Sequence, residues 1–174
     1  SNIGSDGNLS GTVGAARMGA DIGLAGLAVS SASGAQEVVE GSDVVICIAA
    51  ATEPVVNGEW LASGVTLIGA GPTTWRIREV DDAAIVRADK IFVDSVEQAR
   101  DEAGDMASAV DRGLLQWSQL LELRHAVAGT VSGRDNHNQI VFAKMMGTGV
   151  ADVAAAKLAY DKATEMGLGT EMEW

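Results

Sequence analysis

Short apolar runs alternate with segments that begin like helices, and this alternation constrains the fold of the chain more than any other feature. Apolar runs at residues 27–30, 43–49, 65–69 and 90–94 have the length of buried strands. Strands that alternate with helices form βα units and lie parallel in one sheet. The sequence therefore predicts an α/β fold in which helices flank a parallel sheet.

Capping residues predict where several helices start. Ser33-Gly34-Ala35-Gln36 and Ser95-Val96-Glu97-Gln98 match the capping box, in which a serine and a glutamine satisfy each other's backbone amides. We therefore expect helices to begin at Ser33 and Ser95. Further helices are expected at residues 81–88 and 118–128.

The C-terminal part of the chain carries the strongest helix pattern. The Ala-rich segment 150–166 is followed by Gly167, a residue that commonly ends helices. Its apolar residues recur at helical spacing and form one stripe: Val150, Val153, Ala154 and Leu158. A long C-terminal helix is the prediction for this segment.

Charge and cysteine content exclude several classes of protein. The chain has 12 Lys and Arg against 24 Asp and Glu, a formal charge of −12, which disfavours nucleic acid and anionic membrane surfaces as partners. A single cysteine, Cys47, rules out an internal disulfide and fits the reducing cytoplasm. No apolar run approaches the ~18 residues of a membrane span.

Motifs for local catalytic or metal chemistry are weak. Gly69-Ala70-Gly71 is followed by Pro72 rather than by a helix with a third glycine, so it is a poor dinucleotide fingerprint. His125 and His137 lack the spacing of metal ligands. Cys47 lies in an apolar run and is expected to be inert core, and the carboxylates of Glu97, Asp101, Glu102 and Asp105 are expected to form a solvated helix face. No catalytic residue and no metal ligand is assigned.

The predicted sheet itself indicates where a ligand would bind. Ligands of open parallel sheets bind beyond the carboxyl ends of the strands, which points to residues 49–52, 69–71 and 94–95. The small residues there leave room for a flat ring. They also permit tight turns without any ligand, and both interpretations stay open.

Ten short stretches, taken together in their order and spacing, resemble one known family. They are residues 41–46, 53–61, 69–71, 78–81, 87–99, 104–106, 126–129, 142–144, 152–156 and 167–170. The chain resembles the C-terminal, NAD(P)-binding half of the ornithine cyclodeaminase and mu-crystallin family. The resemblance implies a partial Rossmann-like parallel sheet with a long C-terminal helix.

The resemblance also implies a domain organisation and a site. Residues 1–174 would form a single truncated Rossmann-like domain, with βα units over about 1–130 and a C-terminal strand and helix as an appendage over about 131–174. The implied chemistry is cyclodeamination of ornithine or hydride reduction of ketimines and 2-oxo acids with NAD or NADP, on a small amino-acid-like substrate. The residues implied to contact the cofactor are Ala49, Ala50, Gly69, Ala70, Gly71 and Lys144.

Five positions in three places depart from the family pattern. Ala49, Ala50 and Ala51 stand where the family has a Thr/Ser-rich turn facing the nicotinamide, Gly71 where it has an acidic or amide residue, and Met145 where it has Ser. We therefore expect a chain that is not catalytically competent alone and that binds cofactor poorly or not at all. The alternative is a non-catalytic assembly module, and in either case we expect a homodimer or higher oligomer.

Overall fold

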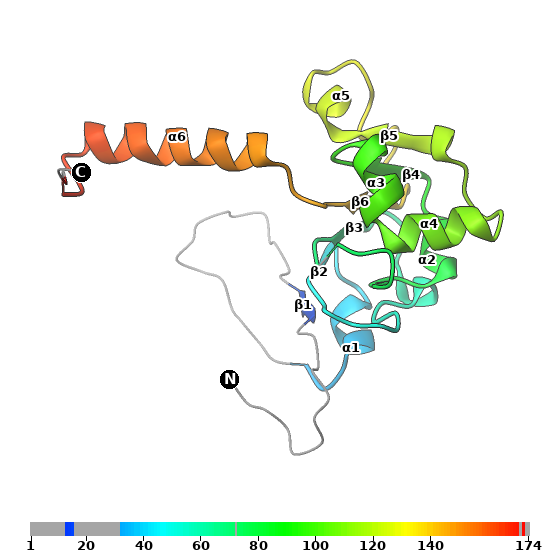
Figure 1. The fold of residues 1–174 in the computed structure, drawn as a ribbon. Coiled ribbons are helices and arrows are strands. Elements are labelled where there is room, and N and C mark those ends of the chain that lie inside the picture. The colour runs from blue at the N-terminus through cyan, green and yellow to red at the C-terminus, as the bar shows by residue number, and fades with distance from the viewer. Residues whose placement is uncertain (1–12, 16–31, 72, 171, 173–174) are drawn as a thin grey trace.

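A computed structural model describes residues 13–15, 32–71, 73–170 and 172 of the chain (Figure 1). Within these residues a six-stranded sheet has the strand order β1-β2-β3-β6-β4-β5. The strands are β1 (Val13–Ala15), β2 (Val44–Cys47), β3 (Thr66–Gly69), β4 (Lys90–Val93), β5 (Leu120–Glu122) and β6 (Val141–Lys144). All neighbouring strands run parallel except β1, which runs antiparallel to β2. The predicted parallel α/β sheet is confirmed.

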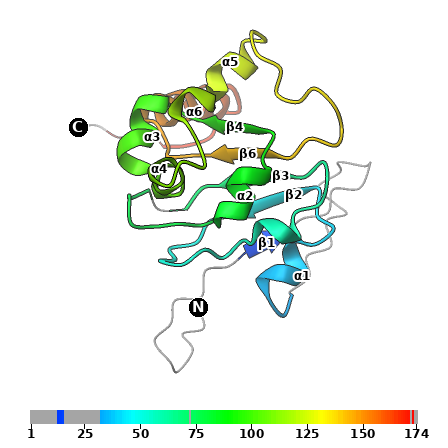
Figure 2. The same ribbon diagram turned by 90° about the vertical axis from the view of Figure 1, so that its right-hand side faces the viewer.

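Two strands depart from what the sequence indicated. β6 belongs to the segment predicted as an appendage, yet it lies between β3 and β4 in the interior of the sheet, as Figure 2 shows. β5 falls in the segment predicted as a helix at 118–128, of which only α5 (Leu123–Val127) is α-helical. The prediction was wrong there because the free edge of β4 pairs with Leu120–Glu122 and overrides the local helical pattern. The run at 27–30 lies outside the described residues.

The remaining helices follow the strands as expected of βα units. They are α1 (Ala35–Val39), α2 (Asp82–Arg87), α3 (Val96–Glu102), α4 (Gly104–Asp111) and α6 (Gly149–Glu165), with short 3-10 turns η2 (Gly58–Trp60) and η3 (Trp117–Gln119). Buried residues of α2, α3 and α4 join those of β2, β3 and β6 in one core cluster, which includes Ala84, Ala99, Met106, Val45, Leu67 and Phe142. These helices therefore cover one face of the sheet.

The capping predictions are confirmed in part. The Ser95 hydroxyl accepts a hydrogen bond from the amide of Gln98 at 3.3 Å and caps α3, but the Gln98 side chain donates to Glu102 and to the Gly147 carbonyl instead. The N-cap of α1 is Gly34 rather than Ser33, with no side-chain cap hydrogen bond, and Glu37 rather than Gln36 accepts the hydrogen bond of the Ser33 amide. The predicted cap is therefore confirmed at Ser95 and wrong at Ser33, where the serine binds Glu37 instead of the backbone of the first turn.

The C-terminal helix is present, but its apolar stripe is not buried. α6 extends away from the sheet (Figure 1), and Val150, Val153 and Leu158 are exposed by 81%, 70% and 61%. The opposite sheet face is also incompletely covered, since Ile46 and Ile48, which alternate with the buried Val45 and Cys47, are exposed. No helix in the described part of the chain is long and apolar enough to cross a membrane.

Candidate functional site

The carboxyl ends of four parallel strands meet at one edge of the sheet. Cys47 of β2, Gly69 of β3, Lys144 of β6 and Val93 of β4 lie in one register row across the sheet. The residues that follow them therefore share that edge, which is where an open parallel sheet binds ligands. The sequence pointed to the same edge.

The small residues predicted at this edge lie side by side. Ala70 donates its amide hydrogen to the Cys47 carbonyl at 2.8 Å, which joins the turn after β3 to the end of β2. A Cβ atom placed on Gly71 would lie 2.9 Å from the backbone nitrogen of Ala49. Ala49, Gly69 and Gly71 are buried, whereas Ala50 is exposed. Two close-packed turns of small residues thus form the floor of the edge.

A buried ion cluster lies directly beneath these turns. Lys144 Nζ is 2.6 Å from Glu79 Oε2 and 3.3 Å from Asp105 Oδ2, and the three side chains are at most 1% exposed. Burying charges is costly unless they are paired and hydrogen-bonded. The cluster therefore persists only because each partner supports the others.

Glu79 connects the cluster to both turns. Its Oε1 atom accepts hydrogen bonds from the amide of Ala49 at 2.9 Å and from the amide of Gly71 at 3.1 Å. The Glu79 carboxylate also fills the volume that a side chain at Gly71 would need. Position 71 therefore requires glycine in this arrangement.

Asp105 holds the backbone of Glu79 in place. Its Oδ1 atom accepts hydrogen bonds from the amides of Glu79 at 2.7 Å and Val80 at 3.1 Å. Its Oδ2 atom has only the ion-pair contact with Lys144 and, within the described residues, no hydrogen-bond donor. Asp105 was predicted to lie on a solvated face; this was wrong because Glu79 and Val80 provide donors that compensate its burial.

Lys144 occupies a different environment from the one that the resemblance implied. It is 1% exposed and its ammonium group is bound by Glu79 and Asp105 inside the protein. Through its ion pair with Glu79, Lys144 stabilises the two turns at the edge. Its direct contact with a cofactor stays a prediction. The residues that sequence reasoning missed, Glu79 and Asp105, carried a usable signal, because each is a carboxylate beside core residues, Val80 and Met106.

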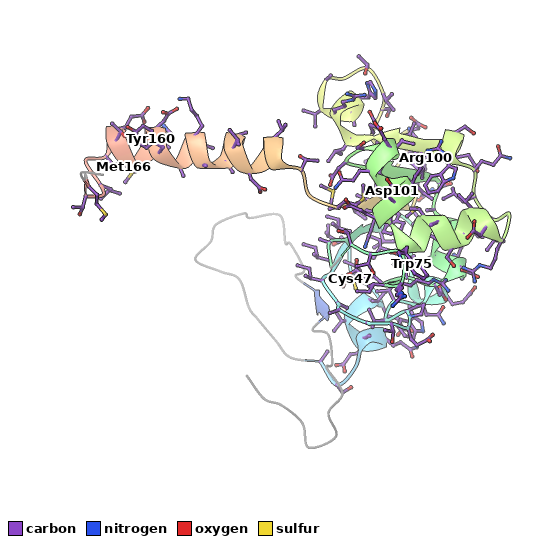
Figure 3. The ribbon with its side chains drawn as sticks, viewed as in Figure 1. Cys47, Trp75, Arg100, Asp101, Tyr160 and Met166 are labelled. Atoms are coloured by element: carbon purple, nitrogen blue, oxygen red, sulfur yellow. The ribbon has the colours of Figure 1, made fainter. Side chains whose placement is uncertain are left out.

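Cys47 is core, as predicted. The pKa of the Cys47 thiol (Figure 3) is raised to about 12, first by burial and then by the neighbouring Glu79 carboxylate. A thiol with such a pKa holds almost no thiolate at neutral pH and is a poor nucleophile. His125 and His137 are both exposed, on α5 and in the following loop, and the described residues include no cluster suited to a metal ion.

Two further contacts shape the edge. The Asp94 carboxylate, just after β4, accepts hydrogen bonds from the amides of Met146 and Gly147, both at 2.7 Å, and so fixes the connection from β6 to α6.

The described residues fit one part of a nicotinamide dinucleotide. Ala50 is exposed and its neighbours at the edge are small, so these side chains would not obstruct a flat ring placed on the turns. The amides of Ala49 and Gly71 are already bound by Glu79 and are not free for a phosphate. Within the described residues no strand leads through a glycine-rich turn into a helix in the manner that cradles a diphosphate.

Several known proteins are similar to this chain in sequence and in fold. A Delta(1)-pyrroline-2-carboxylate reductase of Bacillus thuringiensis is 33% identical over 141 residues, which cover 80% of this chain and 43% of the relative. The structure of Thermococcus litoralis Delta(1)-pyrroline-2-carboxylate reductase in complex with NADH and L-proline matches with a TM-score of 0.74 and 35% identity, covering 81% of this chain and 44% of that one. The iminosuccinate reductase of Paracoccus denitrificans in complex with NAD+ matches with a TM-score of 0.72 and 27% identity, covering 83% and 44%.

The similarity extends over about 80% of this chain and is not confined to one motif. The chain spans less than half the length of the relatives it matches. The family model for ornithine cyclodeaminase/mu-crystallin proteins matches residues 13–167, which include every described strand and α6. The chain therefore belongs to the ornithine cyclodeaminase/mu-crystallin family.

Proposed function

We propose that this chain supplies the nicotinamide-binding edge of an NAD(P)-dependent oxidoreductase that acts on an imine or 2-oxo acid derived from an amino acid. The observation that carries the proposal is the pair of small-residue turns at the carboxyl ends of β2 and β3, joined through one buried carboxylate. Related structures with NADH and NAD+ support the cofactor class, and the names of the relatives support the substrate class.

Each residue of the edge has a defined role in this proposal. Ala49, Ala50, Gly69, Ala70 and Gly71 give the ring a flat surface and exclude bulky groups from it. Glu79, Lys144 and Asp105 hold that surface in place from beneath. A bound cofactor would supply the hydride.

We further propose that the chain does not turn over substrate by itself. Proton transfer requires an acid or base within hydrogen-bond reach of the substrate. Ala and Gly at the edge cannot provide one, and the Cys47 thiol, with its pKa raised to about 12, is buried. No residue among those described is therefore assigned a catalytic role.

Calorimetric titration with NADH and NADPH tests the proposal. Binding with a dissociation constant below about 1 mM, equivalent to about 4 kcal/mol, supports a cofactor-binding edge. Absence of heat with both dinucleotides would contradict it. The titration also reports which of the two cofactors the chain prefers.

A second candidate function is a non-catalytic assembly module built from the same sheet. It is favoured by the exposure of Ile46 and Ile48 on the sheet face and of the apolar stripe of α6. Parallel sheets are normally covered on both faces, so this surface favours association with a second copy of the chain. Failure to bind either dinucleotide together with stable self-association would support this candidate.

A further inference from the structure

We propose that Glu79 is a positioning residue that sets how the turn after β2 lies against the turn after β3, and thereby shapes the surface for the nicotinamide ring. The inference rests on the proposed function for the position of the ring. It assigns a role to a residue that does not itself reach the surface, since Glu79 is 0% exposed.

One carboxylate oxygen forms the bridge between the two turns. Glu79 Oε1 accepts hydrogen bonds from the amides of Ala49 at 2.9 Å and Gly71 at 3.1 Å, and Oε2 accepts from Lys144 Nζ at 2.6 Å and also from the Gly71 amide at 3.1 Å. Oε1 is thus the oxygen that reaches both turns, while the Gly71 amide is shared between the two oxygens. Because Glu79 is fully buried, these hydrogen bonds lie in a low-dielectric environment that strengthens them and holds the two turns together.

The bridge is rigid because the backbone of Glu79 is held on several sides. Its carbonyl accepts hydrogen bonds from the amides of Val55 at 3.0 Å and Val56 at 3.1 Å, and its amide donates to Asp105 Oδ1 at 2.7 Å. A carboxylate anchored in this way cannot follow the turns if they move. The turns must instead adapt to the carboxylate, which is what a positioning role requires.

The test compares two double variants that both lack the ion pair and differ at position 79, where glutamine keeps the bridge and alanine removes the bridge together with the volume of the buried side chain. In Glu79→Gln with Lys144→Met, the glutamine side chain keeps an oxygen that can accept from the amides of Ala49 and Gly71. In Glu79→Ala with Lys144→Met, the bridge is lost. Thermal unfolding is recorded for both, and binding is measured at a temperature at which both are folded.

NADH and ADP-ribose serve as the two probes, because ADP-ribose lacks the nicotinamide ring. We expect the alanine variant to bind NADH about tenfold more weakly than the glutamine variant, with equal affinity for ADP-ribose. If Glu79 had only a structural role, its loss would weaken the binding of NADH and of ADP-ribose by the same factor. Equal NADH affinity in the two variants, or a parallel loss of both ligands, would overturn the proposal.

Amide signals provide a readout that does not depend on cofactor binding. In ¹H–¹⁵N spectra, the Ala49 and Gly71 amides should keep their shifts and exchange protection in the glutamine variant and lose both in the alanine variant. Unchanged Ala49 and Gly71 signals in the alanine variant would refute the bridge. If the unaltered protein binds neither probe, the proposed function fails, and these two amides alone decide whether Glu79 fixes the turns.

Discussion

Lys144 is the cation on which the buried cluster depends. It separates two carboxylates that would otherwise lie close together without a counter-charge, and it is 1% exposed. Lys144 comes from β6, Glu79 from the segment before α2, and Asp105 from α4. The cluster therefore joins three parts of the chain at the floor of the cofactor edge.

Lys144→Met should reduce the free energy of unfolding by about 3 kcal/mol, because removing one partner leaves buried charge without compensation. Urea denaturation at pH 7 measures the loss. Lys157→Met is the matched control: Lys157 pairs with Asp161 on exposed α6, where its side chain is 71% exposed. That change should stay within about 0.5 kcal/mol. Equal effects of the two substitutions would show that the buried cluster contributes no special stability.

Gly71→Asp, which introduces the acidic residue that the family pattern has at this position, should damage the protein. Its Cβ would lie 2.9 Å from the Ala49 nitrogen, and its carboxylate would meet that of Glu79. We expect a loss of about 3 kcal/mol or more and no gain of imine reduction. Denaturation curves and an NADPH-consumption assay with cyclic ketimines check the two parts. A stable variant that turns over substrate would contradict our account of this turn.

At the scale of elements, the ends of helices and strands are tied by single carboxylates. Glu122, the last residue of β5, accepts a hydrogen bond from the amide of Val96 at the start of α3 at 3.1 Å. This hydrogen bond, and then the Arg124 guanidinium, lower the pKa of Glu122 from its ordinary value of 4.5. The carboxylate thus links the edge strand to the neighbouring helix.

Because the pKa of Glu122 is lower in the folded than in the unfolded state, its contribution to stability is present above pH 4.5 and is lost as the pH falls through the lowered value. Glu122→Gln should therefore lower the free energy of unfolding by about 1 kcal/mol at pH 7 and by almost nothing near about pH 3. Denaturation curves recorded across pH 3–7, roughly the range in which carboxylates titrate, measure this difference. Asp101→Asn, exposed on α3, is the control for the removal of one surface carboxylate. A constant difference at every pH would contradict the expectation.

At the scale of the whole molecule, two apolar surfaces among the described residues are suited to association. One is the sheet face with Ile46 and Ile48; the other is α6 with its C-cap, where Leu158, Tyr160 and Met166 are exposed. Figure 3 labels Tyr160 and Met166 on this projecting segment. The sheet has no gap between β3 and β4, because β6 fills it. Self-association is therefore expected through these apolar surfaces rather than through unpaired strands in the centre.

We predict a dimer or larger oligomer at micromolar concentration in about 0.15 M salt, where screening limits repulsion between copies of charge −12. Ile48→Glu and Leu158→Glu should each shift the protein toward the monomer, as measured by light scattering. Val127→Glu introduces the same charge at a residue of α5 that is 83% exposed and should leave the mass unchanged. A stable monomer of the unaltered chain would refute the prediction.

The sequence by itself determined the elements whose signals are local. Apolar runs marked β2, β3 and β4, Asp81 and Ser95 marked the starts of α2 and α3, and alanine content with Gly167 marked α6. Stretches spread over most of the chain also identified the family. Capping and hydrophobic patterning act within a few residues, so they can be read without knowing what packs against them.

Only the tertiary structure decided how distant segments combine. The insertion of β6 between β3 and β4 and the pairing of β5 with β4 depend on strand partners far away in the chain. The same holds for the site: Glu79 and Lys144 are 65 positions apart, yet they share a hydrogen bond beneath the turns. A buried charge is stable only where its partners converge, and that convergence is a property of the folded sheet rather than of any local pattern.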